Sequence, residues 1–457
     1  MAKSKDVNML QGPLLFSIIT YTVPMILTNS LQLLFNAADL VVVGRFCGSN
    51  SVAAVGSTAS LVHLIVNLFI GLSVGCGITA AQALGAGDKE GVHKIVHTAI
   101  PTALLCGLSI TIIGFFGAEF FLKLMSTPDD ILHLAALYLK IYFLGITATM
   151  IYNFCAAILR AVGDTRSPLI FLTVAGVVNV LLNLGFVIFF HLDVAGVALA
   201  TTISQILAAF LVMRELIKRT DSCKLYLSKL KIYKKTLLEF LRIGVPAGIQ
   251  SCTFSFSNVI IQSSINTFGT AVVAGNSAAI NIDNFLYTIT TAFHHTALNF
   301  TGQNVGIKNY KRALSVYKIT LLSAFCVNVV VSGLVVIFSK QLLGIYITDS
   351  AEAIAHGVRR LLIIGAFNFL CVLMDVTAGA IRGTGVSIRP MIISILGVCG
   401  IRLLWVATIF RIPDWHTPTN LYISYPLSWA ITFIALLITY LHVIKSFQKE
   451  KERAHNV

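Results

Sequence analysis

The chain carries a succession of apolar stretches, each long enough to cross a membrane as a helix. About 20 apolar residues span a hydrocarbon layer ~30 Å thick. The stretches expected to do so lie at about 14–43, 51–80, 92–121, 131–159, 167–190, 194–217, 237–266, 271–303, 313–338, 353–380, 387–410 and 420–445. Only 11% of the 457 residues are charged and 56% are hydrophobic, which excludes an ordinary soluble protein. We therefore predict an all-α integral membrane protein with twelve transmembrane helices.

Two sequence landmarks recur 222 residues apart. The pattern Arg-x-x-Gly-x-Thr/Ser-x-x-Pro begins at Arg160 and again at Arg382, and Val23-Pro24 is followed by Val245-Pro246. Landmarks at one fixed offset indicate a duplicated chain. Six spans per half make the two repeats parallel, and such repeats usually surround a central site. We predict an N-lobe at 1–217 with helices 1–6, a cytoplasmic basic linker at 218–236, and a C-lobe at 237–457 with helices 7–12 and a short cytoplasmic tail, arranged around a central cavity.

Basic residues are concentrated on one side of the predicted topology. The chain has 33 Lys and Arg and a net charge of +14. Most of them lie in the two termini and the connections expected on the same side. The six expected on the opposite side are Arg45, Lys123, Lys340, Arg359, Arg360 and Arg411. By the positive-inside rule we expect both termini in the cytoplasm and the protein in the cell membrane. Anionic lipid accounts for the charge, so no nucleic-acid partner is inferred.

The first apolar stretch carries a polar stripe. Asn29, Gln32, Asn36 and Asp39 are spaced by three or four residues, which places them on one helical face. Pro24 lies before them and removes a backbone hydrogen bond, so the helix can bend there. This combination is typical of an ion- or substrate-binding element that bends. The alternative is that Asp39 is simply solvated near the outer end of its helix.

Other polar residues lie within later stretches. Asn179 and Asn183 are four residues apart in the fifth stretch, and Thr201 lies in the sixth. Side chains of these types also serve as packing contacts between membrane helices. In the second half, Asp283 and Tyr287 share a face of the eighth stretch.

Asp375 lies in the tenth stretch and Arg402 in the eleventh. Either Asp283 or Asp375 exchanges a proton or binds a cation, or one of them forms a structural ion pair with Arg402. The repeated Arg160 and Arg382 motif is interpreted as architectural: each arginine ends a helix, bonds its last carbonyls and meets lipid phosphates.

The sequence lacks the motifs of an energised or catalytic protein. It contains no nucleotide-binding loop, no nucleophile constellation and no metal-ligand spacing, and its nine cysteines are scattered. We therefore expect no enzyme activity and no cofactor. Uphill transport would have to draw on an ion gradient.

Several segments together resemble the multidrug and toxic compound extrusion (MATE) family, in its DinF-like bacterial branch. They are Val23-Pro24, the stretch Gln32–Gly44 (QLLFNAADLVVVG), Leu159–Pro168 (LRAVGDTRSP), Gly302–Gly306 (GQNVG) and Ile381–Pro390 (IRGTGVSIRP). The resemblance covers nearly the whole chain. It implies two six-helix lobes that face a cavity and export organic, often cationic, drugs in exchange for Na⁺ or H⁺.

The resemblance also assigns roles to residues. Asp39 matches the carboxylate of the family's N-lobe, Asn179 and Thr201 match polar ligands beside it, and Pro24 matches the proline at which the first helix bends. Asn183 stands where DinF-like members commonly have an aspartate, which removes one negative charge. If the coupling ion is Na⁺, Asp39, Asn179 and Asn183 are its expected ligands.

We therefore predict a secondary active efflux antiporter, working as a monomer in the lipid bilayer on small organic substrates. The candidates for the substrate cavity are Gln32, Asn36, Asp283, Tyr287, Asp375 and Arg402. The alternative is a flippase for lipid-linked saccharides from the same broad superfamily. Such a flippase should present several basic residues to its pyrophosphate-bearing substrate.

Overall fold

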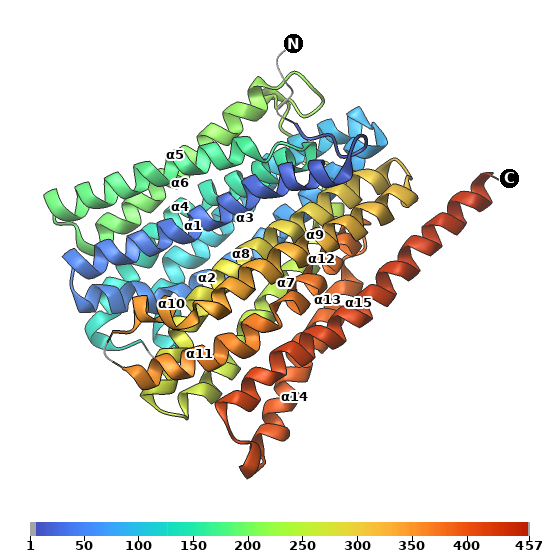
Figure 1. The fold of residues 1–457 in the computed structure, drawn as a ribbon. Coiled ribbons are helices and arrows are strands. Elements are labelled where there is room, and N and C mark those ends of the chain that lie inside the picture. The colour runs from blue at the N-terminus through green and yellow to red at the C-terminus, as the bar shows by residue number, and fades with distance from the viewer. Residues whose placement is uncertain (1–5, 126, 349, 456–457) are drawn as a thin grey trace. The chain divides into compact units, whose positions relative to one another are not determined.

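The computed structural model describes residues 6–125, 127–348 and 350–455, and this part of the chain is helical without a β-strand (Figure 1). The helices of the first half are α1 (Leu14–Phe46), α2 (Ser49–Ala86), α3 (Lys89–Leu124), α4 (Asp129–Val162), α5 (Arg166–Leu184) and α6 (Asp193–Lys218). Those of the second half are α7 (Lys234–Asn266), α8 (Thr270–Gly306), α9 (Tyr310–Ile337), α10 (Ser339–Tyr346), α11 (Ala351–Ala366), α12 (Asn368–Gly383), α13 (Ile388–Ser394), α14 (Ile401–Ala407) and α15 (Pro418–His455). The π-helical segments Gly185–Phe189 and Ile395–Gly400 continue α5 and α13.

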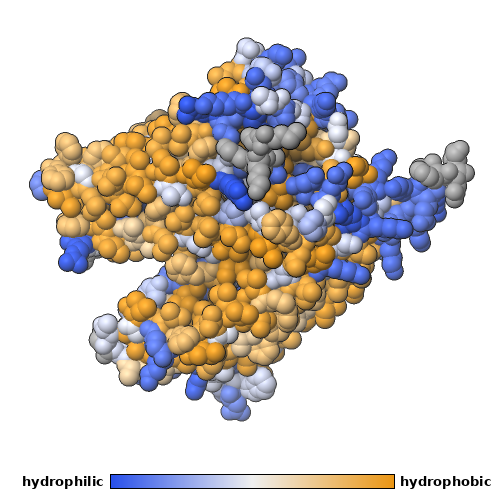
Figure 2. Space-filling view, turned by 45° about the horizontal axis from the view of Figure 1, so that its top comes forward, coloured by the Kyte–Doolittle hydropathy of each residue, from blue (hydrophilic) through white to orange (hydrophobic). Residues whose placement is uncertain are grey.

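Most of these helices are suited to a membrane. In the described part of the chain, nine are long and apolar enough to cross one, or up to ten if α11 and α12, bent by 45° at their junction, form a single span. Large apolar side chains such as Phe116 and Phe189, both 79% exposed, are explained by contact with lipid. Figure 2 shows hydrophobic side chains over most of the visible helix flanks and hydrophilic ones at helix ends, including the C-terminal end of α15. The protein is a multi-pass membrane protein.

Corresponding turns in the two halves share their local structure. Gly48 before α2 and Gly269 before α8 both have positive φ, at 94° and 91°. Asp88 accepts a hydrogen bond from the backbone N–H of Gly91 and so caps α3, and Asn309 caps α9 in the same way. These pairs are spaced by 221 residues, which is within one residue of the spacing of the sequence landmarks.

The chain folds into two compact units. Unit 1 comprises Met1–Asn8 and Val23–Gly248, and unit 2 comprises Met9–Thr22 and Ile249–Val457. Helices α1 and α7 therefore each contribute to both units. The change of unit falls next to Pro24 in α1 and next to Pro246 in α7.

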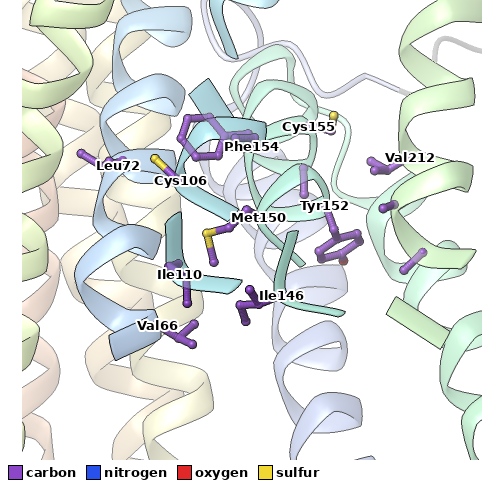
Figure 3. Packing of buried hydrophobic residues seen from close by; sticks show 14 of the residues in the cluster. Val66, Leu72, Cys106, Ile110, Ile146, Met150, Tyr152, Phe154, Cys155 and Val212 are labelled. Carbon is purple, nitrogen blue, oxygen red and sulfur yellow. The ribbon is translucent and has the colours of Figure 1, made fainter. Parts of the chain in front are cut away.

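The core of unit 1 is centred on α4, which packs against α2, α3 and α6. Figure 3 shows Met150 and Ile146 of α4 close to Ile110 of α3. Phe154 and Tyr152 lie further along the same helix and are also fully buried. Close packing of this kind fixes the positions of the helices that carry the polar residues of unit 1.

Helix α2 and the first part of α7 approach each other backbone to backbone. A Cβ added to Gly71 would lie 2.5 Å from the backbone nitrogen of Gly248, and one added to Gly75 would lie 2.4 Å from the carbonyl oxygen of Phe240. Gly71 and Gly75 form a Gly-x-x-x-Gly motif, as do Gly244 and Gly248. Such motifs allow membrane helices to pack closely.

The connection between α6 and α7 is folded against unit 1. The backbone N–H of Tyr226 donates to Nε2 of His97 on α3 at 3.1 Å, and Leu225 donates to the carbonyl of Leu216. Arg219 binds Asp6 at 2.6 Å and Asp221 at 2.7 Å. The predicted basic linker is thus an ordered part of unit 1.

Unit 2 is organised around α8 and α12. Helix α8 packs against α9, α11 and α12, and α12 also contacts α15. Small residues again permit a close approach, because a Cβ added to Gly379 would lie 2.5 Å from the carbonyl oxygen of His294. A Cβ added to Gly383 would likewise lie 2.5 Å from the carbonyl oxygen of Leu298.

Candidate transport site

The four residues predicted to form the ion site lie together in unit 1 as a closed ring of hydrogen bonds. The Nδ2 group of Asn183 donates to Oδ1 of Asp39 and, at 3.3 Å, to Oδ1 of Asn179. Asn179 donates to Oγ1 of Thr201 at 3.3 Å. The Thr201 hydroxyl donates to Oδ2 of Asp39, also at 3.3 Å. Each carboxylate oxygen of Asp39 therefore accepts one hydrogen bond, from α5 and α6 respectively.

Local packing brings α1 to α5 at this point. Asn179 and Asn183 are one turn apart on α5, so both face Asp39, and Asn183 is fully buried. Phe35 lies one turn before Asp39, and a Cβ on Gly176 of α5 would lie 1.9 Å from its ring. Gly176 thus makes room for Phe35. This contact holds α1 beside α5 next to the polar ring.

An apolar cluster lies directly beyond the ring. Val42 and Val43 of α1 pack with Val187 of the π-helical segment and Val197 of α6. Tyr138 of α4 is partly buried against the same cluster. Along α1, Asp39 is therefore followed by apolar packing at Val42 and Val43. It is preceded by the exposed amides of Gln32 and Asn36.

The ring contains one oxygen without a partner. Oδ1 of Asn183 is buried and makes no hydrogen bond with the described residues. An unsatisfied buried carbonyl oxygen is costly, and it is also the type of ligand that Na⁺ and other hard cations use. Among all the described residues, the ring included, no group of three or more His, Cys, Asp or Glu side chains could hold a metal ion.

In unit 2 the structure corrects the alternative in which Asp283 or Asp375 pairs with Arg402. Asp283 of α8 forms its ion pair with Arg360 of α11. The side chain of Asp375 lies near that of Tyr287, and its backbone carbonyl is 2.8 Å from Nδ1 of His294. Arg402 instead lies over the ring of Tyr425.

The surroundings of two arginines differ from those that the sequence predicts. Arg360, expected at the outer surface, is only 5% exposed and lies against Asp283. Arg382, expected to meet lipid phosphates, is 6% exposed and donates to Oε1 of Gln250 at 2.6 Å. Arg360 is the charged residue whose role the sequence reasoning missed. Its spacing of seven residues from Ala353, which is buried on the same helix face, is the signal that would have placed it inside.

The remaining candidates are distributed over both units. Pro24 lies inside α1 and the helix continues through it. Tyr287 is 48% exposed on α8, whereas Asp375 on α12 is 8% exposed. Gln32 and Asn36 are exposed on α1. Within unit 1 hydrogen bonds therefore join Asp39, Asn179, Asn183 and Thr201. Within unit 2, Tyr287 lies near Asp375.

Comparison with known proteins identifies the family. The MatE family model matches residues 24–184 and again 246–407, so its two matches begin 222 residues apart. The chain is 28% identical over 437 residues to the probable multidrug resistance protein YoeA of Bacillus subtilis, covering 94% of each chain. It is 25% identical over 392 residues to the probable multidrug resistance protein NorM of Thermotoga maritima, covering 84% of this chain and 83% of that protein.

A solved structure has the same fold. It is described as the outward-facing conformation of a multidrug resistance MATE family transporter of the MOP superfamily, and its TM-score to this chain is 0.90 at 22% identity. The match covers 98% of this chain and 99% of that one. Two matches to the family model cover well over half of the chain. The protein therefore belongs to the MatE family, whose members are multidrug and toxic compound extrusion transporters rather than enzymes.

Proposed function

We propose that the protein is a secondary active antiporter that exports small organic, cationic compounds in exchange for H⁺ or Na⁺ by alternating access. The observation that carries this proposal is the closed ring of hydrogen bonds around Asp39. One ionisable group, hydrogen-bonded to two neighbouring helices, lies in a helix that is long and apolar enough to span a membrane. Such groups are costly in a membrane and mark ion and substrate pathways.

Either coupling ion would rearrange this ring. A proton on Asp39 converts one acceptor oxygen into a donor, so that Asn183 or Thr201 loses its acceptor. Na⁺ needs oxygen ligands, and the unpartnered Oδ1 of Asn183 supplies one beside the carboxylate. In both cases the contacts that join α1 to α5 and α6 change.

An ion drives transport only if it binds the outward- and inward-facing states with different affinities. Helix α1 contributes to both units and contains Pro24, so a structural change at Asp39 can be transmitted along this helix. We propose that ion binding at Asp39 alters α1 and favours release of the organic cation. This coupling requires no cofactor.

The proposed architecture is twelve transmembrane helices in two parallel repeats around a central cavity, with an N-lobe at 1–217, a linker at 218–236 and a C-lobe at 237–457. The helices α7 and α8, with 33 and 37 residues, are long enough to span a membrane, although they are not among the nine described helices that are also apolar enough by composition. The equivalent turns of the two halves and the doubled family match support the repeat.

The proposed orientation has both termini in the cytoplasm, with a monomer in the cell membrane as the working unit. Its support is the distribution of basic residues. The basic stretch between α6 and α7 would then face the anionic lipid of the inner leaflet.

The test is gradient-driven efflux of a cationic dye from proteoliposomes, with a Na⁺ gradient and a pH gradient imposed separately. We expect one gradient to drive efflux by the wild-type protein and Asp39→Asn to abolish the response. Asp414→Asn, a substitution at an exposed carboxylate outside the long helices, is the matched control and should transport normally. Undiminished gradient-driven efflux by Asp39→Asn would exclude Asp39 as the coupling residue.

A further inference from the structure

Arg402 is a buried charge in the middle of an apolar segment of unit 2. It belongs to α14, within the membrane-spanning stretch Ile388–Arg411, and is 5% exposed. Its guanidinium carbon lies 3.9 Å from the centroid of the Tyr425 ring and 5.6 Å from that of Trp429. Its Nε group donates to Oγ of Ser428 at 3.1 Å. All three partners lie on α15.

The described residues provide Arg402 with no carboxylate partner. Asp283 is paired with Arg360, and the Asp375 side chain lies near Tyr287 and the oppositely charged Arg382. An arginine inside a membrane is usually paired with an acid or lines a polar path, because removing its charge from water is costly. Stacking on two aromatic rings offsets part of this cost but leaves the positive charge without a counter-charge.

The geometry leaves one edge of the guanidinium available. The Tyr425 ring covers its face and Ser428 takes the Nε edge. No hydrogen-bond partner for either Nη atom is found in the described ranges. The Nη edge of a guanidinium carries two parallel N–H groups that fit a carboxylate in bidentate fashion.

We propose that Arg402, with Tyr425, Ser428 and Trp429, forms a binding site in unit 2 for the carboxylate of an aromatic organic anion or zwitterion. The carboxylate binds the Nη edge, and the aromatic body packs beside the Trp429 and Tyr425 rings. The site extends the substrate range beyond organic cations. The role of this site in export rests on the proposed transport function, whereas binding of the carboxylate does not.

Trp429 provides a direct readout of binding. The chain has three tryptophans, and replacing Trp405 and Trp415 by Phe leaves Trp429 as the single fluorophore. The probe is 4-iodobenzoate, whose iodine quenches tryptophan fluorescence at short range. Its neutral analogue 4-iodobenzamide has a similar size and the same iodine. Purified protein in detergent is titrated with each compound.

We expect saturable quenching by 4-iodobenzoate, with an affinity at least about tenfold higher than that of 4-iodobenzamide. Arg402→Gln should weaken 4-iodobenzoate binding by about tenfold or more and leave 4-iodobenzamide binding unchanged. Arg359→Gln, at an exposed arginine of the same unit, is the matched control and should bind like the parent. Equal affinity for the two compounds, or an unchanged affinity in Arg402→Gln, would overturn the proposal.

A second variant covers the case in which Arg402→Gln does not fold. Arg402→Lys keeps the charge but loses the planar fork, so 4-iodobenzoate should bind more weakly than to the parent. If Arg402→Lys binds it equally well, the bidentate site is wrong. Dye efflux is measured on the same preparations. If the parent protein does not bind 4-iodobenzoate but shows gradient-driven dye efflux, only this site is contradicted. If it binds 4-iodobenzoate but shows no gradient-driven efflux, only the proposed transport function is contradicted.

Discussion

At the scale of single residues, the ion pair between Asp283 and Arg360 makes a prediction about stability. The Arg360 side chain is 6% exposed and that of Asp283 is 20% exposed, so removing either partner leaves a buried charge. Arg360→Met should destabilise the protein by about 3–5 kcal/mol. The measurement is thermal unfolding of the purified protein in detergent.

The double variant Asp283→Leu/Arg360→Met is the informative control. Replacing a whole buried ion pair by apolar residues is often neutral or stabilising, because no charge remains to be desolvated. We expect the double variant to recover most of the stability lost by Arg360→Met. If the double variant is as unstable as the sum of the two single variants, the two side chains do not form an energetically coupled pair.

At the scale of elements, the crossing of α2 and α7 depends on glycine. A Cβ on Gly71 would meet the backbone of Gly248 at 2.5 Å and that of Gly244 at 2.6 Å, and backbone atoms cannot move aside as a flexible side chain can. Gly71→Ala should therefore lower the stability of the protein by about 1–3 kcal/mol. Gly56→Ala is a matched control on the same helix, because a Cβ there meets no atom within 4 Å.

The control variant Gly56→Ala should raise the stability of the protein, whereas Gly71→Ala should lower it. Alanine in a helix interior is more stable than glycine by about 0.5–1 kcal/mol when its side chain meets no obstacle. Thermal unfolding of both variants, side by side, separates the close helix crossing from the general effect of alanine. An equal change in the two variants would show that α2 and α7 do not pack backbone to backbone.

The connection between α6 and α7 makes a second prediction at this scale, about a thiol. Burial raises the pKa of Cys223 from 9.0 to about 12, with a smaller contribution from the charge of Asp221. A raised pKa keeps the thiol protonated at neutral pH, so about a thousandfold less thiolate is available for reaction with maleimide. Cys223 should label very slowly at pH 7.5, and its rate should continue to rise beyond pH 10.

Leu227, 55% exposed in the same connection, supplies the comparison. In a Cys223→Ser background, Leu227→Cys should label rapidly, and its rate should level off above about pH 9 because an exposed thiol has a pKa near 8.5. Both single-thiol proteins need the other cysteines replaced. Rapid labelling of Cys223 at neutral pH would mean that this connection is not packed against unit 1.

The same elements show what a sequence can predict here. Hydropathy located the long helices, and a spacing of four residues placed Asn179 and Asn183 on one face, because these patterns depend on neighbours along the helix. The ring around Asp39 could be anticipated only through the family resemblance. The partner of Asp283, the burial of Arg382 and the contact between Gly71 and Gly248 depend on which helices pack together. That information is not contained in the periodicity of any one helix.

At the scale of the whole molecule, the two units share two helices. The boundary between units falls at Thr22 and Val23 in α1 and at Gly248 and Ile249 in α7, beside Pro24 and Pro246. A proline inside a helix lacks one backbone hydrogen bond, so the helix bends more easily there. If transport moves the units, these two positions must absorb the change in backbone angles.

We therefore expect Pro246→Ala to slow dye efflux without lowering stability, because alanine restores the missing hydrogen bond and stiffens α7 at the unit boundary. Pro24→Ala should act in the same direction on α1. Pro101 provides the control, since it lies inside α3, which belongs wholly to unit 1. Pro101→Ala makes the same local change but should leave the efflux rate unaltered. The rates are measured in proteoliposomes, and hydrogen exchange at residues 247–250 reports the local stiffening. If Pro101→Ala slows efflux as much as Pro246→Ala does, the effect comes from the loss of proline in general and not from its place between the units.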